Sequence, residues 1–482
     1  MKGKGGAGMT AQERVANMGT QKLLPLLFSM AVPAILANVV NALYNVGDRL
    51  FVGRLVGSDA LGAVGLTFPL SNITGALTIM LSIGGGAMLS LSLGQHKTER
   101  TNEIFTSICV VAFVVALLIS GGFFFFAGPL VQLCGAGEGS ALYPIAVSYL
   151  KITAFGQFFS IMNLALAAVI RAEGNTRYAM VVTMSGALLN CGLDAIFMMA
   201  FHMGVEGAAL GTVIGQIVSC LMSLQYYVRG LGVSRFLGVR SFRPSTAVRV
   251  ASLGLAPSVF QALSFVNNIL VNQSLRYYAD LELGAGGGDM ALSAVSVMQT
   301  VENLAIMFIM GMNNAVSTVI SYNYGSGRYE RVRKATLTGQ VVAAIVSILL
   351  WAAMLFTPNA LFSLFSPDSP ELAAYGALAM RRGKLFIFGL GFQTLASMYY
   401  SAIGKPKRAV LISISRNGLF LIPSLLLLPR FFGLDGVLCA TSVSDGCSLV
   451  LVACLYAAGL RELSRQSGRE ASAPGAPPLP QK

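Results

Sequence analysis

The chain carries few charged and few catalytic side chains. Only 11% of its 482 residues are Asp, Glu, Lys or Arg, against about 25% in an ordinary soluble protein, so it cannot cover a water-facing surface with polar groups. It has two histidines and seven cysteines, without the paired spacing of a zinc site. It also lacks a phosphate-binding loop and a nucleophile–base pattern. These absences exclude a soluble enzyme, a secreted disulfide scaffold and an ATP-driven pump with its own nucleotide domain.

Apolar residues are abundant instead. They make up 55% of the chain, and the mean hydropathy is +0.70. Apolar runs of 18 or more residues recur from Leu23 to Leu460, and each is long enough to cross a bilayer core of about 30 Å. The sequence therefore predicts an all-α membrane protein with twelve transmembrane helices. They are expected at 23–50, 60–94, 105–127, 143–171, 177–200, 205–228, 249–274, 291–324, 335–356, 376–402, 408–428 and 437–459.

The net charge of +13 is informative through its distribution. If the N-terminus is cytoplasmic, 24 of the 33 Lys and Arg residues fall in inside loops and tails, as the positive-inside rule requires. This predicts a multi-pass plasma membrane protein with both termini in the cytoplasm. The basic residues serve orientation and contact with anionic lipid headgroups, and no nucleic-acid partner is expected. The cluster Arg381, Arg382 and Lys384 goes against this trend.

The chain contains an internal duplication. Residues 60–100 align without a gap onto residues 291–331, at a shift of 231, with nine identities. Three shorter matches keep nearly the same shift: Met30–Pro33 with Gly254–Pro257, Arg171–Gly174 with Ser401–Gly404, and Gly204–Thr212 with Gly433–Thr441. Six spans per half give the two halves the same orientation, related by an axis along the membrane normal. We expect two pseudo-symmetric six-helix lobes, the architecture of alternating-access transporters.

These patterns set the domain boundaries. A cytoplasmic N-terminal arm is expected at 1–22 and an N-lobe at 23–228. A cytoplasmic connector at 229–248 leads to a C-lobe at 249–460. The Pro-rich segment 461–482 is expected to be a disordered cytoplasmic tail.

Three spans of the first half carry polar side chains that share helix faces. Asn190 and Asp194 are four residues apart, so they lie on one face. Charged groups inside a membrane are costly, and they mark functional sites by default. If the faces converge, oxygen atoms gather that could hold a shared proton or Na⁺. Pro33, four turns before Asp48, is expected to bend the first helix. The other members of these faces are Asn41, Tyr44, Asp48, Thr212 and Gln216.

The second half departs from this pattern. Asn272 stands at the place of Asp48, and the charges in its spans are Glu302, Arg416 and Asp445. An unpaired charge there would be costly, so we expect Arg416 to form an ion pair with Glu302 or Asp445. A structural pair and a substrate contact both remain open for these residues.

The motifs resemble those of the multidrug and toxic compound extrusion (MATE) transporters, over about residues 21–460. They are Pro33 with Tyr44–Gly53 (YNVGDRLFVG), Asn190–Asp194 (NCGLD), Gly204–Thr212 (GVEGAALGT) and Gly404–Lys407 (GKPK). The chain is most similar to the DinF-like and MepA-like branches. The resemblance implies an N-lobe cation site, for H⁺ or Na⁺, made by the residues matching Asp48, Asn190, Asp194 and Thr212, with Tyr44 beside it and Pro33 at a bend.

The resemblance implies a drug/ion antiporter, with H⁺ or Na⁺ as the coupling ion, no cofactor and no metal other than Na⁺. Substrates would be small amphipathic, often cationic, drugs, and the transporter would act as a monomer among membrane lipids. Its substrate cleft is expected to include Asn41, Asn268, Asn272, Glu302 and Tyr399. The main alternative is a lipid or lipid-linked oligosaccharide flippase of the same superfamily, whose cavity would need cationic residues. A channel and a membrane-embedded enzyme are further alternatives.

Overall fold

The computed structural model describes residues 9–51, 56, 58–140, 142–284, 286–365 and 370–471, and a few side chains within these helices, including that of Asp48, lie outside the description. The secondary-structure elements of the described residues are all helices, with no strand among them. They divide into two compact units, Met1–Ser258 and Val259–Lys482. Each unit is treated on its own below.

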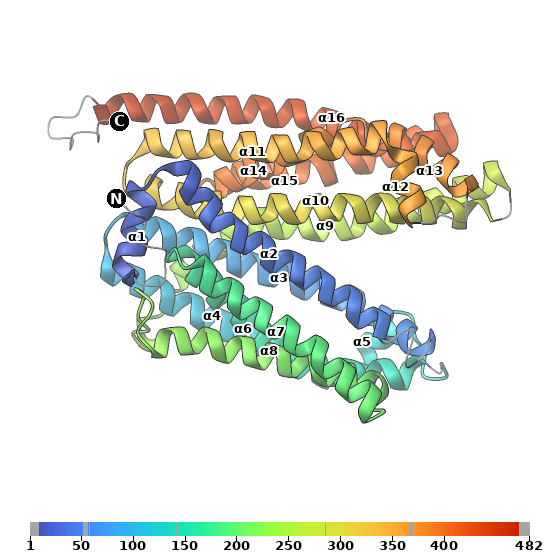
Figure 1. Ribbon diagram of the computed structural model, residues 1–482, viewed down its shortest axis with the longest axis horizontal. Helices are drawn as coiled ribbons and strands as arrows, with labels where there is room; N and C mark the ends of the chain where they lie inside the picture. Colours follow the sequence, from blue (N-terminus) through green and yellow to red (C-terminus); the bar gives the residue numbers. More distant parts are fainter. Residues whose placement is uncertain are drawn as a thin grey trace. The chain divides into compact units, whose positions relative to one another are not determined.

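The elements of the first unit follow the expected spans (Figure 1). The long helix α6 packs against α3, α4 and α8, and α7 packs against α2 and α8. The elements are α1 (Ala11–Thr20), α2 (Leu23–Phe51), α3 (Ser58–Gly94), α4 (Thr98–Phe125), α5 (Ala127–Leu133), α6 (Leu142–Ala172), α7 (Thr176–Ala195), the π-helix η2 (Ile196–Ala200), α8 (Gly204–Val228), the 3₁₀ helix η3 (Val239–Ser241) and the first part of α9 (Pro244–Leu283).

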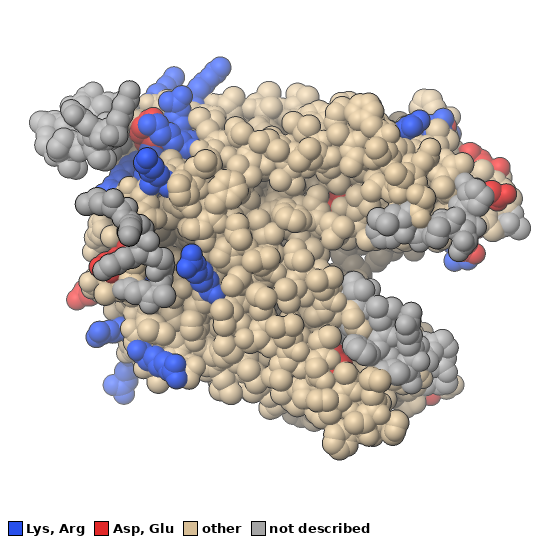
Figure 2. Space-filling view, in the orientation of Figure 1, with Lys and Arg blue, Asp and Glu red and all other residues tan. Residues whose placement is uncertain are grey.

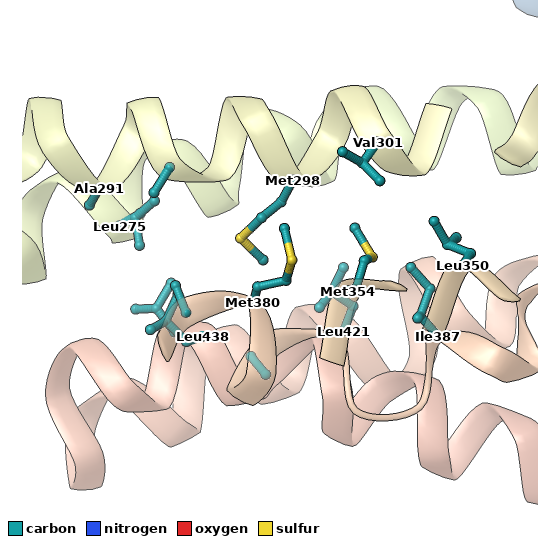
Figure 3. Packing of buried hydrophobic residues seen from close by; sticks show 14 of the residues in the cluster. Leu275, Ala291, Met298, Val301, Leu350, Met354, Met380, Ile387, Leu421 and Leu438 are labelled. Atoms are coloured by element: carbon teal, nitrogen blue, oxygen red, sulfur yellow. The ribbon is translucent and has the colours of Figure 1, made fainter. Parts of the chain in front are cut away.

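The second unit contains the rest of α9 and packs around α10, α11 and α16. Its buried apolar cluster joins α9, α10, α11, α13 and α16, with Met298, Met354 and Met380 filling the space between the helices (Figure 3). The elements are α10 (Gly287–Gly325), α11 (Tyr329–Phe356), α12 (Pro358–Phe365), α13 (Pro370–Gly383), the 3₁₀ helix η4 (Ile387–Gly389), α14 (Leu390–Ala402), α15 (Pro406–Ile414), the π-helix η5 (Ser415–Phe420) and α16 (Leu421–Ala471).

Ten helices in the described part of the chain are long and apolar enough to cross a membrane. They cover eleven of the twelve predicted spans, because the eleventh and twelfth form a single element, Pro406–Ser467, with a non-helical kink at Gly433. The tenth predicted span is divided into α13 and α14 by residues 384–389. Every predicted span thus has a helical counterpart, and the tenth contains a break that the hydropathy did not reveal.

The structure repeats the sequence duplication. Helices α4 and α11 begin at positions 231 apart, as do the short helices α5 and α12. The turns at Gly174 and Gly404 share a left-handed conformation, with φ of 81° and 79°, which only glycine adopts without strain. A matching hydrogen bond precedes each turn. The Ser90 hydroxyl donates to the Ala172 carbonyl in one unit, and the Ser321 hydroxyl donates to the Ala402 carbonyl in the other.

Two boundaries differ from the predicted ones. The division between the units lies within α9 rather than in the connector, because the first turns of α9 pack closely on α3: a side chain at Gly254 would overlap the Met80 carbonyl, and one at Gly84 would overlap the Val250 carbonyl. The prediction that the tail is disordered from 461 is wrong as far as Ala471, where α16 ends; residues 472–482 lie outside the described residues. The N-terminal arm contains α1, which starts with a capping box between Thr10 and Glu13.

Pro33 lies inside α2, and the helix continues across it from Leu23 to Phe51. The visible faces of both units carry few charged side chains along the helices, and Lys and Arg gather mainly near helix ends (Figure 2). This is the distribution of a protein whose helix sides face lipid.

Candidate functional site

The first unit brings together three of the predicted cation-site residues. Asn190 and Asp194 lie in the last turns of α7 and are 3% and 0% exposed. With the Asn190 amide oriented to satisfy both neighbours, its nitrogen donates to Asp194 Oδ2 at 3.2 Å, and its oxygen accepts from the Thr212 hydroxyl of α8 at 3.1 Å. The i, i+4 spacing therefore places an amide and a carboxylate on the face that meets α8.

Glycines in α8 make this approach possible. A side chain at Gly211 would overlap the Asp194 carboxylate, and a Cβ at Gly215 would lie 3.1 Å from the Cβ of Asn190. The neighbouring Gln216 carries a buried Oε1 atom with no hydrogen-bond partner. Two residues after Asp194 the helix widens into the π-helix η2, a departure from α-helical bonding that is frequent at functional sites. The arrangement offers carboxylate, amide and hydroxyl oxygens, the ligands of a proton or a hard cation.

The remaining predicted cation-site residues lie on α2, which packs against α7. A Cβ at Gly47 would lie 3.8 Å from Cys191 Sγ, so this turn of α2 contacts α7 one residue after Asn190. Tyr44 is half-buried and Asn41 is exposed. The side chain of Asp48 lies outside the described residues, so its part in the site stays a prediction.

The second unit contains a buried cluster of four charges. Arg416 Nε donates to Asp445 Oδ1 at 2.6 Å, and Arg416 Nη2 donates to Glu302 Oε1 at 3.4 Å. The other oxygen of Glu302 accepts from Lys384 Nζ. All four side chains are at most 15% exposed. The predicted ion pair of Arg416 is confirmed with both carboxylates, which gives the cluster two positive and two negative charges.

Lys384 lies in the break between α13 and α14. Side chains of other helices satisfy the backbone groups that the break frees: the Thr441 hydroxyl donates to the Gly383 carbonyl at 2.7 Å, and the Ser442 hydroxyl accepts from the Leu385 amide at 3.1 Å. The Trp351 indole donates to the Leu385 carbonyl at 2.9 Å. Irregular backbone at membrane depth is tolerated only where protein or a cavity surrounds it. The hydrogen bonds from other helices therefore stabilise the break between α13 and α14.

The charged cluster borders a cavity of about 210 Å³ within the second unit. Glu302, Lys384 and Arg416 contribute to its wall, and Thr441 lies beside them. Amides supply much of the remaining polar surface. They are Asn267, Asn268, Gln299, Asn303 and Asn417. Asn267 is 5% exposed, and its Oδ1 has no hydrogen-bond partner, so the cavity presents both charged and unused polar atoms.

The predicted cleft residues of this unit are placed differently from one another. Glu302 and Asn268 line the cavity, where Asn268 accepts from Gln299 Nε2 at 3.2 Å. Asn272 is exposed on α9. Tyr399 is 1% exposed and packs against Tyr400 and Tyr456, with ring centroids 5.1 and 5.9 Å away. The structure therefore places Tyr399 in a buried aromatic cluster rather than beside Glu302.

Sequence reasoning missed Lys384 as the partner of Glu302. The available signal was its place in a basic cluster that violates the charge distribution, next to Gly383. Arg382 in the same cluster forms an exposed ion pair with Asp435, so the structure assigns partners to two of the three residues that the charge distribution left unexplained.

A family model described as MatE matches residues 33–196 and 250–426, more than half of the chain. The chain belongs to the MATE family of transporters. MATE proteins are transporters and not enzymes. The chain is 24% identical to the "Multidrug export protein MepA" of Staphylococcus haemolyticus over 424 residues, which cover 87% of this chain and 90% of that protein.

Solved structures agree with this membership. The chain is 32% identical to the "MATE multidrug transporter DinF-BH in complex with R6G", with a TM-score of 0.80 and coverage of 91% of this chain and 96% of that one. A "MATE in the bent conformation" matches with a TM-score of 0.85 at 21% identity, covering 95% and 99% of the two chains, and it supports the fold. The predicted MATE resemblance and twelve-helix fold are thus confirmed.

Proposed function

We propose that this MATE transporter is a secondary antiporter that exports small amphipathic, often cationic, organic compounds in exchange for H⁺ or Na⁺. It would act as a monomer in the plasma membrane, with both termini in the cytoplasm. Family membership supports transport, and the names of the relatives MepA and DinF-BH support drugs as substrates. The observation that carries the coupling assignment is the fully buried Asp194, bonded to Asn190 beside Thr212.

Burial makes this carboxylate suited to coupling. An ionised carboxylate out of water is costly, so a proton or Na⁺ bound at Asp194 changes the free energy of its surroundings far more than at an exposed acid. In the proposed cycle Asp48 and Asp194 take up the ion from outside, α2 rearranges at Pro33, and the drug is released. Return to the inside-facing state frees the ion. The ion shifts the two-state equilibrium only by its differential affinity for the two states.

The test is dye efflux in everted vesicles, with a proton gradient and a Na⁺ gradient imposed separately. Whichever gradient drives efflux identifies the coupling ion. Asp48→Asn and Asp194→Asn should each abolish gradient-driven efflux while the protein remains folded. Asp289→Asn is the matched control, because Asp289 is 78% exposed and forms only a long 3.9 Å contact with Arg276. Full ion-driven transport by both test variants would reject the coupling site.

A flippase for lipid-linked oligosaccharides is less well supported. It would need a cationic cavity for its pyrophosphate group, whereas Lys384 and Arg416, which line the cavity of the second unit, are each paired with a carboxylate. The net charge of this cluster is zero, so it does not favour an anionic lipid.

A further inference from the structure

The segment that joins α8 to α9, residues 229–243, combines arginines with exposed apolar side chains. It contains four Arg and neither Asp nor Glu. Phe236, Leu237 and Val239 are 52%, 48% and 66% exposed. Neighbouring apolar side chains are unfavourable in water, whereas basic residues beside exposed Phe and Leu are typical of segments that lie in a membrane surface. The composition therefore indicates contact with lipid rather than with bulk water.

Backbone hydrogen bonds hold this segment on the first turns of α4. The Arg235 amide donates to Asn102 Oδ1 at 2.8 Å, and the Leu237 amide donates to Thr106 Oγ1 at 3.0 Å. Asn102 and Thr106 are four residues apart, so they lie on one face of α4. The segment therefore runs along this face of α4, with Leu237 at the height of Thr106.

The face of α4 that holds the segment continues as a lipid-facing surface. Phe113 and Leu117, seven and eleven residues after Thr106, return to the same side of the helix and are 49% and 56% exposed. Helix α4 has 28 residues, which is about 42 Å at a rise of about 1.5 Å per residue and close to the thickness of a bilayer with its headgroups. Thr106 lies about 12 Å from the start of α4. Leu237 is therefore level with the border between the headgroups and the acyl chains.

The arginines of the segment are mostly free to bind anions. Arg243 pairs with Glu103 at 2.8 Å. The other three, Arg229, Arg235 and Arg240, are exposed and form no ion pair within the part of the chain that the structure describes. Arg235 and Arg240 directly flank the exposed apolar residues. The phosphate groups of anionic lipids complement these two charges at the same depth.

Other contacts tie the segment to the rest of the first unit, beside α1 (Figure 1). Arg14 Nη2 of α1 donates to the Leu231 carbonyl at 2.7 Å, and Glu173 Oε1, in the turn after α6, accepts from the Ser234 amide at 2.9 Å. The segment is thus fixed to three elements through its main chain, and Phe236, Leu237 and Val239 stay exposed.

We propose that residues 235–240 form an interfacial anchor for anionic phospholipid. The side chains of Phe236, Leu237 and Val239 enter the outer part of the acyl region, and the guanidinium groups of Arg235 and Arg240 bind lipid phosphates. The partner is the surface of the surrounding bilayer, in the cytoplasmic leaflet under the proposed topology. The anchor is independent of the coupling ion and of the exported compound.

The depth of the segment is measured by fluorescence quenching in the full-length protein, purified and reconstituted in nanodiscs. Phe236→Trp is compared with the parent, whose only Trp is Trp351 and which supplies the baseline. We expect strong quenching by phospholipids brominated near the headgroup and weaker quenching by those brominated near the terminal methyl. Gln12→Trp is the matched control, because Gln12 is exposed on the polar helix α1, and its quenching should stay near the baseline.

The preference for anionic lipid is measured with bromine only on phosphatidylglycerol, diluted in phosphatidylcholine. Quenching in Phe236→Trp should exceed the value that the mole fraction of phosphatidylglycerol sets. Adding Arg235→Gln and Arg240→Gln should lower this enrichment by about fivefold for each Arg removed at low salt, and high salt should have the same effect on the unaltered charges.

A second pair of basic residues controls for net charge. Arg333 and Lys334 both already face Glu330, at 3.8 and 3.6 Å. Arg333→Gln combined with Lys334→Gln removes the same number of charges and should leave the enrichment in Phe236→Trp unchanged.

Three results would overturn the proposal. The first is equal quenching of the two introduced tryptophans, and the second is enrichment that survives the loss of Arg235 and Arg240. The third is a tryptophan in Phe236→Trp that aqueous iodide quenches and brominated lipid does not, because that surface would then face water and be open to a soluble partner.

Discussion

The two units share a fold but place their charges at different repeat positions. In the first unit the carboxylate is Asp194, with an amide and a hydroxyl around it. At a shift of 230 the positions of Asn190 and Asp194 become Phe420 and Ser424. The charged residues of the second unit likewise correspond to uncharged residues in the first. At shifts of 229 to 231, Glu302, Lys384, Arg416 and Asp445 correspond to Ser71, Thr153, Gly186 and Gln216, in that order.

This difference shows that the two halves of a duplicated fold can keep the same backbone and carry different buried groups. Backbone features are kept in both halves, such as the left-handed turns at Gly174 and Gly404. The buried charged side chains named above, which cost free energy unless they are satisfied, stand at different repeat positions in the two halves. In the first unit a carboxylate lies beside a neutral amide and a hydroxyl, and in the second unit two carboxylates are paired with Lys and Arg side chains. The first arrangement offers neutral oxygen ligands beside a carboxylate, whereas in the second the carboxylates are neutralised by Lys384 and Arg416.

The largest expected effect, on the free energy of unfolding, comes from removing one positive charge from the buried charged cluster of the second unit. Arg416→Met would leave the carboxylates of Asp445 and Glu302 short of a counter-charge, and removing one partner of a buried ion pair costs about 3–5 kcal/mol. The free energy of unfolding in detergent measures this. Arg382→Met is the matched control, because its ion pair with Asp435 is exposed and such pairs contribute about 0–1 kcal/mol. Equal losses in the two variants would show that the cluster is not a structural network.

Thr212 and Thr441 stand at the same repeat position in the two units. Replacing either should have a smaller effect, on transport in the first unit and on stability in the second. Thr441→Ala removes the donor to the Gly383 carbonyl at the helix break, and an unsatisfied buried carbonyl costs about 1–3 kcal/mol. Thr212→Ala removes a hydroxyl that meets Asn190, so it should weaken ion-driven efflux more than stability. Thermal unfolding and efflux assays on the pair separate the two roles. The comparison fails if Thr441→Ala lowers only transport and Thr212→Ala lowers only stability.

A methyl group can test the ion site without changing a ligand. In Gly211→Ala the new Cβ would overlap Asp194 Oδ1, which must shift, so we expect ion-driven efflux to fall about tenfold, equivalent to about 1.4 kcal/mol, with modest loss of stability. Gly192→Ala is the control on α7, because a Cβ there would meet no described atom within 4 Å. Equal efflux by the two variants would contradict the placement of the site.

The smallest effect concerns the turn after α6, where Glu173 stands at the repeat position of Ile403. Glu173 is fully buried, and burial raises its pKa from the ordinary 4.5, although the Ser234 amide donates to it at 2.9 Å. The native state therefore keeps this proton to higher pH than the unfolded chain does, and the free energy of unfolding should fall as pH rises above about 4.5 and through the raised pKa.

Glu173→Gln should remove that pH dependence, because an amide oxygen can still accept from Ser234 but carries no charge. Melting temperatures of the parent and the variant, measured from pH 4 to pH 8, check this. A parallel decline of both curves would mean that Glu173 does not cause the loss.

The sequence was sufficient for the features that depend on periodicity and local spacing. Apolar runs predicted the spans, the shift of 231 predicted two related halves, and the i, i+4 spacing predicted that Asn190 and Asp194 share a face. It also predicted that Arg416 is paired, because the cost of a buried charge is general. Features that depend on contacts between residues far apart in the sequence were missed. Glu302 and Lys384 are 82 residues apart. The break at Lys384 follows the basic pair Arg381 and Arg382 inside a predicted span, and Tyr399 packs in an aromatic cluster that its neighbours define.

The most direct test of the account is to compare two modes of transport by Asp194→Asn in proteoliposomes. If Asp194 couples the ion to the substrate, the variant should still exchange labelled for unlabelled substrate in counterflow, because that step needs no ion gradient, and it should fail to accumulate substrate when the driving gradient is imposed. Accumulation at the parent's level would contradict the assignment of ion coupling to the first unit.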